Sequence, residues 1–151
     1  MKNVVITLAL ALALTGCGAM NPITSKPHTP YGIASRLADD VALTVNQSDA
    51  TIDAWRVQGL LDATEERNIL GWSNLVNVVN AQFIACIRVV HIQSRANGYT
   101  VCAKSLAAGI GDPTELAALH VTNPKSQANV IAMANAIASL VTNAISALGG
   151  N

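Results

Sequence analysis

The stretch from Ala50 to about Gln93 contains no proline, and its second half places apolar side chains at heptad spacing. These residues follow one another at intervals of 4-3-4-3-4, and they are Trp72, Val76, Val79, Phe83, Cys86 and Val90. This period brings them to one face of an α-helix that can pack against another helix. We therefore expect a long helix of roughly forty residues, with a change of face or a kink near Gly71.

Start and stop signals predict the other helices. Thr29-Pro30 is typical of a helix N-terminus. Proline has no backbone N–H, but at the first helical position this costs nothing, because an N–H there would have no hydrogen-bond partner within the helix. The same pattern recurs at Asp112-Pro113 and Asn123-Pro124, whereas Asn97-Gly98 indicates a turn. The long helix is expected to start at Ser48-Asp49. The other expected helices span residues 31–46, 101–108, 113–121 and 125–148. The sequence thus predicts an all-α fold for residues 31–151, a small bundle of four to five helices with a long second helix.

The last expected helix carries no charged side chain after Lys125. Its apolar residues also follow heptad spacing, and they are Val130, Ala134, Ile137, Val141, Ala144 and Leu148. Uncharged polar residues occupy the opposite side, namely Asn135, Ser139, Thr142 and Ser146. Three interpretations remain open. The helix is a central member of the bundle, or it forms an interface through Val130, Ile137, Val141 and Leu148, or it inserts into a bilayer despite its polar side chains.

The N-terminus has the organisation of a secretory signal peptide. Lys2 supplies a positive charge, and the eleven residues from Val4 to Leu14 form an apolar run that is too short to cross a bilayer. The motif that ends this run, Leu14-Thr15-Gly16-Cys17, resembles the lipobox of bacterial lipoproteins. The resemblance implies cleavage before Cys17 and acylation of this cysteine, so that residues 1–16 are a signal peptide. Residues 17–30 contain three prolines and are interpreted as a lipidated tether that reaches at most about 45 Å.

The resemblance also implies a location. Enterobacterial lipoproteins with an aspartate after the lipidated cysteine stay in the inner membrane, and this chain has Gly18 at that position. We therefore expect a lipid-anchored protein of the bacterial outer membrane that faces the periplasm. Acylation with more than one chain is sufficient for stable anchoring.

With Cys17 assigned to lipid, Cys86 and Cys102 remain as a pair in an oxidising compartment. The turn at Asn97-Gly98 lies between them. Residues at similar distances from such a turn face each other in an antiparallel helical hairpin. We expect a Cys86–Cys102 disulfide, with two buried free thiols as the alternative.

The composition argues against several function classes. Nine basic and nine acidic residues leave no net charge to attract nucleic acid. The adjacent carboxylates Asp39-Asp40 and Glu65-Glu66 point to different sides of a helix, which is unfavourable for acid–base catalysis. His28, His91 and His120 are scattered, and no spacing typical of metal ligands, phosphate loops or dinucleotide-binding loops occurs. We expect no catalytic residue, no cofactor and no metal site.

These observations favour a non-enzymatic binding or scaffolding lipoprotein that acts through a helical face. Its partner would be another envelope protein or a second copy of the chain, and exclusion and immunity functions belong to this class. The alternative is a membrane-active lipoprotein that uses the uncharged helix 125–148 for lysis or pore assembly. An envelope enzyme ranks third, because the sequence contains no catalytic motif.

Overall fold

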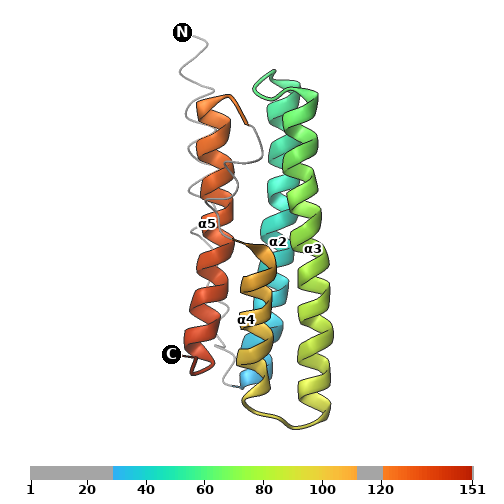
Figure 1. The fold of residues 1–151 in the computed structure, drawn as a ribbon, viewed down its shortest axis with the longest axis vertical. Coiled ribbons are helices and arrows are strands. Elements are labelled where there is room, and N and C mark those ends of the chain that lie inside the picture. The colour runs from blue at the N-terminus through green and yellow to red at the C-terminus, as the bar shows by residue number, and fades with distance from the viewer. Residues whose placement is uncertain (1–28, 112–120, 151) are drawn as a thin grey trace.

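The computed structural model describes residues 29–111 and 121–150, which form an antiparallel bundle of four helices (Figure 1). The helices are α2 (Pro30–Val57), α3 (Ala63–Ile92), α4 (Gly98–Ile110) and α5 (Pro124–Ala147). The prediction of a small all-α bundle is confirmed. The short helix expected between Pro113 and Val121 falls almost entirely outside the described residues.

Side-chain caps fix the beginnings of three helices. Thr29 Oγ1 accepts a hydrogen bond from the N–H of Gly32, and the Asn123 side chain accepts from Lys125 and Ser126. Two of the three predicted Xaa-Pro starts are therefore confirmed, and the third, Asp112-Pro113, lies outside the described residues. Asp62 begins α3 with a capping box, in which its carboxylate accepts from Glu65 N–H and Glu65 accepts from the Asp62 N–H. Each cap satisfies N–H groups that have no partner within the helix.

The expected helix boundary near Asn46 is wrong. The helix α2 continues without a break to Val57, and Ser48 is a buried residue in its interior. The Ser48 hydroxyl donates to the carbonyl of Thr44, four residues earlier, instead of capping a new helix. Asp49 accepts a hydrogen bond from Ser73 of α3, so this carboxylate joins two helices rather than starting one.

The boundary lies instead between Val57 and Ala63, which divides the expected forty-residue helix. Gly59 adopts a φ of +70°, a left-handed conformation that glycine enters without the penalty of a side chain. Asp62 then begins α3, which runs for 30 residues through Gly71. From the sequence, Glu65 was considered only as a member of the adjacent pair Glu65-Glu66, and the capping box that it forms with Asp62 was missed.

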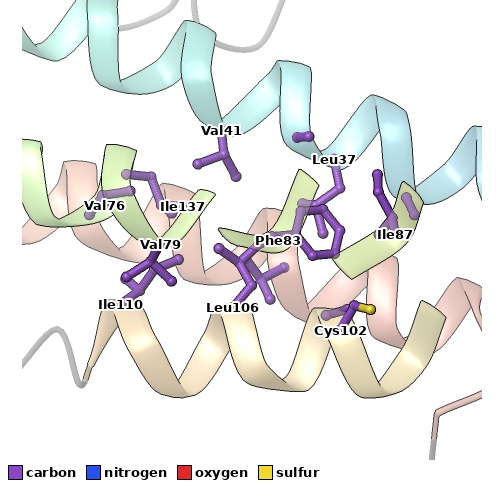
Figure 2. Close-up of a cluster of buried hydrophobic side chains, with 14 of the residues drawn as sticks. Leu37, Val41, Val76, Val79, Phe83, Ile87, Cys102, Leu106, Ile110 and Ile137 are labelled. Carbon is purple, nitrogen blue, oxygen red and sulfur yellow. The ribbon is translucent and has the colours of Figure 1, made fainter. Parts of the chain in front are cut away.

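The predicted apolar seam of α3 forms the centre of the larger hydrophobic cluster. The helix packs against α2 on one side and α4 on the other, and α5 packs against the same two helices. Phe83 points between α2 and α4, toward Leu37 and Leu106, and Val76 and Ile137 extend the cluster toward the middle of the bundle (Figure 2). Burial of these side chains is the main source of stability for such a bundle.

A second cluster fills the end of the bundle beyond the last turn of α4. There α2, α3 and α5 enclose Ile52, Trp55, Ile69 and Val130, each at most 3% exposed. Because α4 ends at Ile110, three of the four described helices surround this end.

The hairpin of α3 and α4 is unusually close. Cys86 and Cys102 form the expected disulfide, with their Cα atoms 5.8 Å apart. A methyl group added at Gly98 or at Gly109 would lie 2.5–2.6 Å from the side chain of Val90 or Val79, so glycine is required on both sides of the bridge. The disulfide and the glycines together fix the register of α4 on α3.

At the opposite end, Glu65 is the one buried charged side chain among the described residues, with 5% of its surface exposed. Its Oε1 accepts from the N–H of Thr122 at 2.6 Å and from the Thr122 hydroxyl at 2.7 Å, and its Oε2 accepts from Asp62 N–H at 2.9 Å. Ser126, also buried, donates to the carbonyl of Leu60. These bonds attach the beginning of α5 to the turn between α2 and α3.

These hydrogen bonds, above all the one from the Thr122 N–H, lower the pKa of Glu65 below its ordinary value although burial raises it. A carboxylate whose pKa falls on folding stabilises the protein above its unfolded-state pKa, and this stabilisation is lost as the pH falls through the folded-state pKa.

Replacing Glu65 with glutamine should lower the free energy of unfolding by about 1–3 kcal/mol near pH 7, because the amide has one acceptor oxygen where the carboxylate has two and carries no charge. Below about pH 4 the difference from the wild type should shrink, since the wild-type carboxylate also becomes protonated. Urea unfolding followed by circular dichroism at several pH values measures both effects. Glu66→Gln is the matched control, because Glu66 is a partly exposed partner of Arg56 and should cost less than about 1 kcal/mol. An equal loss for the two variants would contradict the role of Glu65.

The disulfide closes a loop with a sequence separation of 16 residues, for which about 3 kcal/mol of stabilisation is expected. In a chain that carries Cys17→Ser, adding Cys86→Ala and Cys102→Ala should lower the free energy of unfolding by about this amount. Alkylation and mass spectrometry should find both thiols protected before reduction. Two freely alkylated thiols in the unfolded, unreduced protein would overturn the pairing.

Candidate functional site

The residues singled out in the sequence do not gather at one place. Cys17 lies outside the described residues, and Cys86 and Cys102 are bonded to each other. Val130, Ile137 and Val141 are each at most 1% exposed in the core, and Leu148 packs partly buried against the larger cluster. The proposed interface residues of the last helix therefore face their own bundle.

This placement corresponds to the first of the three interpretations of helix 125–148. Its apolar seam packs on α2 and α4, and Asn135, Ser139, Thr142 and Ser146 are exposed on the other side. No partner can reach Val130, Ile137 or Val141 while the bundle is closed. The exposed side of α5 offers polar and small side chains only, which gives little apolar area for binding.

Several polar side chains of the described residues pair with one another within the bundle, and they form no cluster typical of a metal site. Within 29–111 and 121–150, no three His, Cys, Asp or Glu side chains lie close enough together to hold a metal ion. His91 stacks on Tyr31 with ring centroids 4.0 Å apart, and its Nδ1 lies 3.3 Å from the hydroxyl of Tyr99. Arg36 pairs with Asp40 and Arg56 with Glu66 at the surface.

The most distinctive surface lies on α3. Six exposed residues follow one another at 3-4-3-4-3 spacing along the second half of this helix, and we call them the outer seam: Leu75, Val78, Gln82, Ala85, Val89 and Ile92. This is a second heptad pattern in the same helix as the buried one. One helix thus carries two apolar seams, of which the bundle covers only one.

The exposure of the outer seam follows from the packing. Because α3 contacts α2 and α4 through its buried seam, its outer side has no neighbour among the described residues. Leu75, Val78, Val89 and Ile92 keep 47%, 48%, 51% and 82% of their surface exposed. Single exposed apolar residues are common, but here two pairs lie on one face of a helix, with Gln82 and Ala85 between them. Four large apolar side chains on one exposed face are of the kind found at interaction sites.

The charge around the outer seam has one sign. No acidic residue occurs between Arg67 and Gly111, whereas Arg88 is exposed beside Val89. Arg88 forms no salt bridge with any residue that the structure describes. Its guanidinium is therefore free to bind a carboxylate of a partner.

The sequence contained the signal for this surface. From the sequence, only the heptad series from Trp72 to Val90 was identified in this helix, and the second series, which joins Leu75 and Val78 to Val89 and Ile92, was missed. Periodicity alone cannot decide which of two seams is buried, because both satisfy the same helical spacing.

By length and composition, two described helices would be able to cross a membrane, namely α3 and α5. In each, 28% of the most apolar window is buried within the bundle. Core helices of proteins that never enter a membrane pass the same test, so this finding alone assigns no membrane-spanning role.

The chain was also compared with known proteins. Neither the models of known protein families, nor the curated proteins, nor the solved structures include a match to this chain.

Proposed function

We propose that this protein is a non-enzymatic binding or scaffolding lipoprotein of the bacterial envelope, and that it binds its partner through the outer seam of α3. The observation that carries the proposal is the exposed heptad series from Leu75 to Ile92. A stripe of this spacing fits the apolar face of another helix better than it fits a small molecule.

The partner that fits this surface is an amphipathic helix of another envelope protein. Its apolar face would cover Leu75, Val78 and Val89, and an acidic side chain would meet Arg88. A second copy of this chain fits less well, because α3 has no acidic residue after Glu66 to pair with the Arg88 of its twin. In an exclusion or immunity function, such a surface would bind and block another envelope protein without catalysing a reaction.

The membrane anchor in this proposal is Cys17. Its support is the order of a basic start, an apolar run and Leu14-Thr15-Gly16-Cys17, together with Gly18 in place of an aspartate. The proposed location is the periplasmic face of the outer membrane. There the tether would keep the outer seam within reach of other envelope proteins.

A membrane-active role of helix α5 has less support. Insertion of α5 would remove Val130, Ile137 and Val141 from the core and expose the residues that they cover on α2 and α4. Binding through the outer seam needs no such opening, because that surface is already exposed.

Replacing Cys17 with serine should prevent acylation. The protein should then leave the membrane fraction for the soluble fraction, or keep its signal peptide uncleaved. Metabolic labelling with a palmitate analogue, together with the mass of the mature protein, checks this prediction. Ser25→Ala in the tether is the control and should leave both label and fractionation unchanged. Unchanged membrane association and mass in the Cys17 variant would overturn the lipid anchor.

A photo-crosslinking amino acid at Gln82, in the middle of the outer seam, should capture one envelope protein in intact cells. Adding Leu75→Glu and Val78→Glu should reduce this crosslink about tenfold, because two charges replace buried contact area at the interface. Leu43→Glu is the matched control, since Leu43 on α2 is 44% exposed and lies outside the seam.

Thermal unfolding should show that all of these variants remain folded. An undiminished crosslink in the Leu75/Val78 variant would refute binding through the outer seam. A crosslink to a second copy alone would replace the proposed partner with self-association.

A further inference from the structure

The turn between α3 and α4 forms one end of the bundle (Figure 1). Exposed basic and apolar residues are concentrated in and around this turn. They lie in the last turns of α3, in the turn itself and in the first two turns of α4. We call this set the basic tip, and its members are Arg88, Val89, Ile92, Arg95, Val101 and Lys104.

The apolar members of the basic tip are among the most exposed apolar residues of the protein. Ile92 is 82% exposed, Val101 64% and Val89 51%. Val101 and Arg95 also line an open depression with Ala96, Asn97 and Gly98. These side chains gain nothing from the fold of their own chain, so their burial is available to a partner.

The charged members are all cations. Arg88, Arg95 and Lys104 are exposed, and none of them is in a salt bridge with a residue that the structure describes. The N-terminus of α4 also opens at this tip, where the Asn97 side chain makes no capping hydrogen bond. The positive end of the helix dipole of α4 therefore lies at this tip. The nearest described acids on α2, Asp39 and Asp40, lie more than two helical turns beyond its start, and Asp40 pairs with Arg36.

The opposite end of the bundle has the reverse charge. Residues 49–67 contain five acids and two bases, whereas residues 82–111 contain three bases and no acid. This separation gives the bundle an electric dipole along its long axis. An anionic surface would therefore attract the basic tip and repel the other end.

The chain that leads to the proposed anchor leaves from the same end. The helix α2 begins at Pro30 beside the α3–α4 turn (Figure 1). Only twelve residues, 18–29, separate it from Cys17 in the sequence. At most about 45 Å of chain would then lie between the basic tip and a bilayer that holds acyl chains on Cys17.

We infer that the basic tip docks end-on against an anionic phospholipid surface. Ile92, Val89 and Val101 would enter the headgroup layer, while Arg88 and Arg95 contact lipid phosphates and Lys104 adds long-range attraction. Apolar insertion combined with basic residues is the usual physical basis of interfacial binding. The inference rests in part on the proposed anchor at Cys17, which would bring the basic tip close to a membrane. The contact between the tip and the lipid itself requires no acyl chain, so the docking and the anchor can be tested separately.

The test uses residues 17–151 with Cys17→Ser, which contain every member of both buried clusters and no acyl chain. This protein should bind vesicles of phosphatidylglycerol and phosphatidylcholine, but not vesicles of phosphatidylcholine alone, in a flotation assay. Raising the NaCl concentration to about 0.5 M should weaken binding, because salt screens the attraction. Arg88→Gln with Arg95→Gln should weaken it about thirtyfold. Ile92→Ser should weaken it about tenfold.

The other end of the bundle supplies matched controls. Arg56→Gln with Arg67→Gln removes two exposed cations there, and Val57→Ser removes an apolar side chain that is 88% exposed. Both variants should bind the anionic vesicles like the parent protein. Leu75→Glu with Val78→Glu should also retain vesicle binding, since these positions lie outside the tip.

Equal binding to both kinds of vesicle, or no binding at all, would overturn the inference. So would equal losses in the tip variants and their controls. A failure of Cys17 acylation in cells would leave these vesicle results unchanged, because the assay contains no acylated protein.

Discussion

The bond between Cys86 and Cys102 determines more of this molecule than any other single contact. It joins α3 to α4 at one height, and the absence of a side chain at Gly98 and Gly109 allows the two helices to approach closely in this register. With α3 held in this register, Val76, Val79 and Phe83 face the core and Leu75, Val78 and Val89 face outward. The same bond holds Arg88, Arg95 and Lys104 at one end. Both proposed contact surfaces therefore depend on it.

The charged side chains at the two ends of the bundle differ in whether they have partners among the described residues. At the acidic end, Glu65 is buried, accepts three hydrogen bonds and attaches α5 to the turn that follows α2. Its charge is therefore satisfied within the chain. At the basic tip, three cations have no ionic partner among the described residues and lie beside exposed Ile92 and Val101. That end is stabilised further only by something outside the chain.

The two proposed contacts share Arg88, Val89 and Ile92, so a molecule that is docked on a membrane would bind a partner helix only through the middle of the outer seam. A tether and a basic tip at the same end would make the bundle stand end-on, with its long axis pointing away from the membrane surface. The middle of the outer seam, around Leu75, Val78 and Gln82, would then stand clear of the headgroups and remain free to bind a helix. The core would stay closed throughout, because neither contact uses Val130, Ile137 or Val141.

The sequence by itself determined the helical class, the caps at Thr29 and Asn123, the buried seam of α3 and the cysteine pair, because helical period and capping chemistry are local properties. It misplaced the end of α2, since Ser48 and Asp49 suit a helix start equally well when no neighbour is known. Only the tertiary structure showed Asp49 bonded to Ser73 and the true start at Asp62. The choice between the two seams of α3 was likewise tertiary. Both have helical spacing, and which one is buried depends on where α2 and α4 pack.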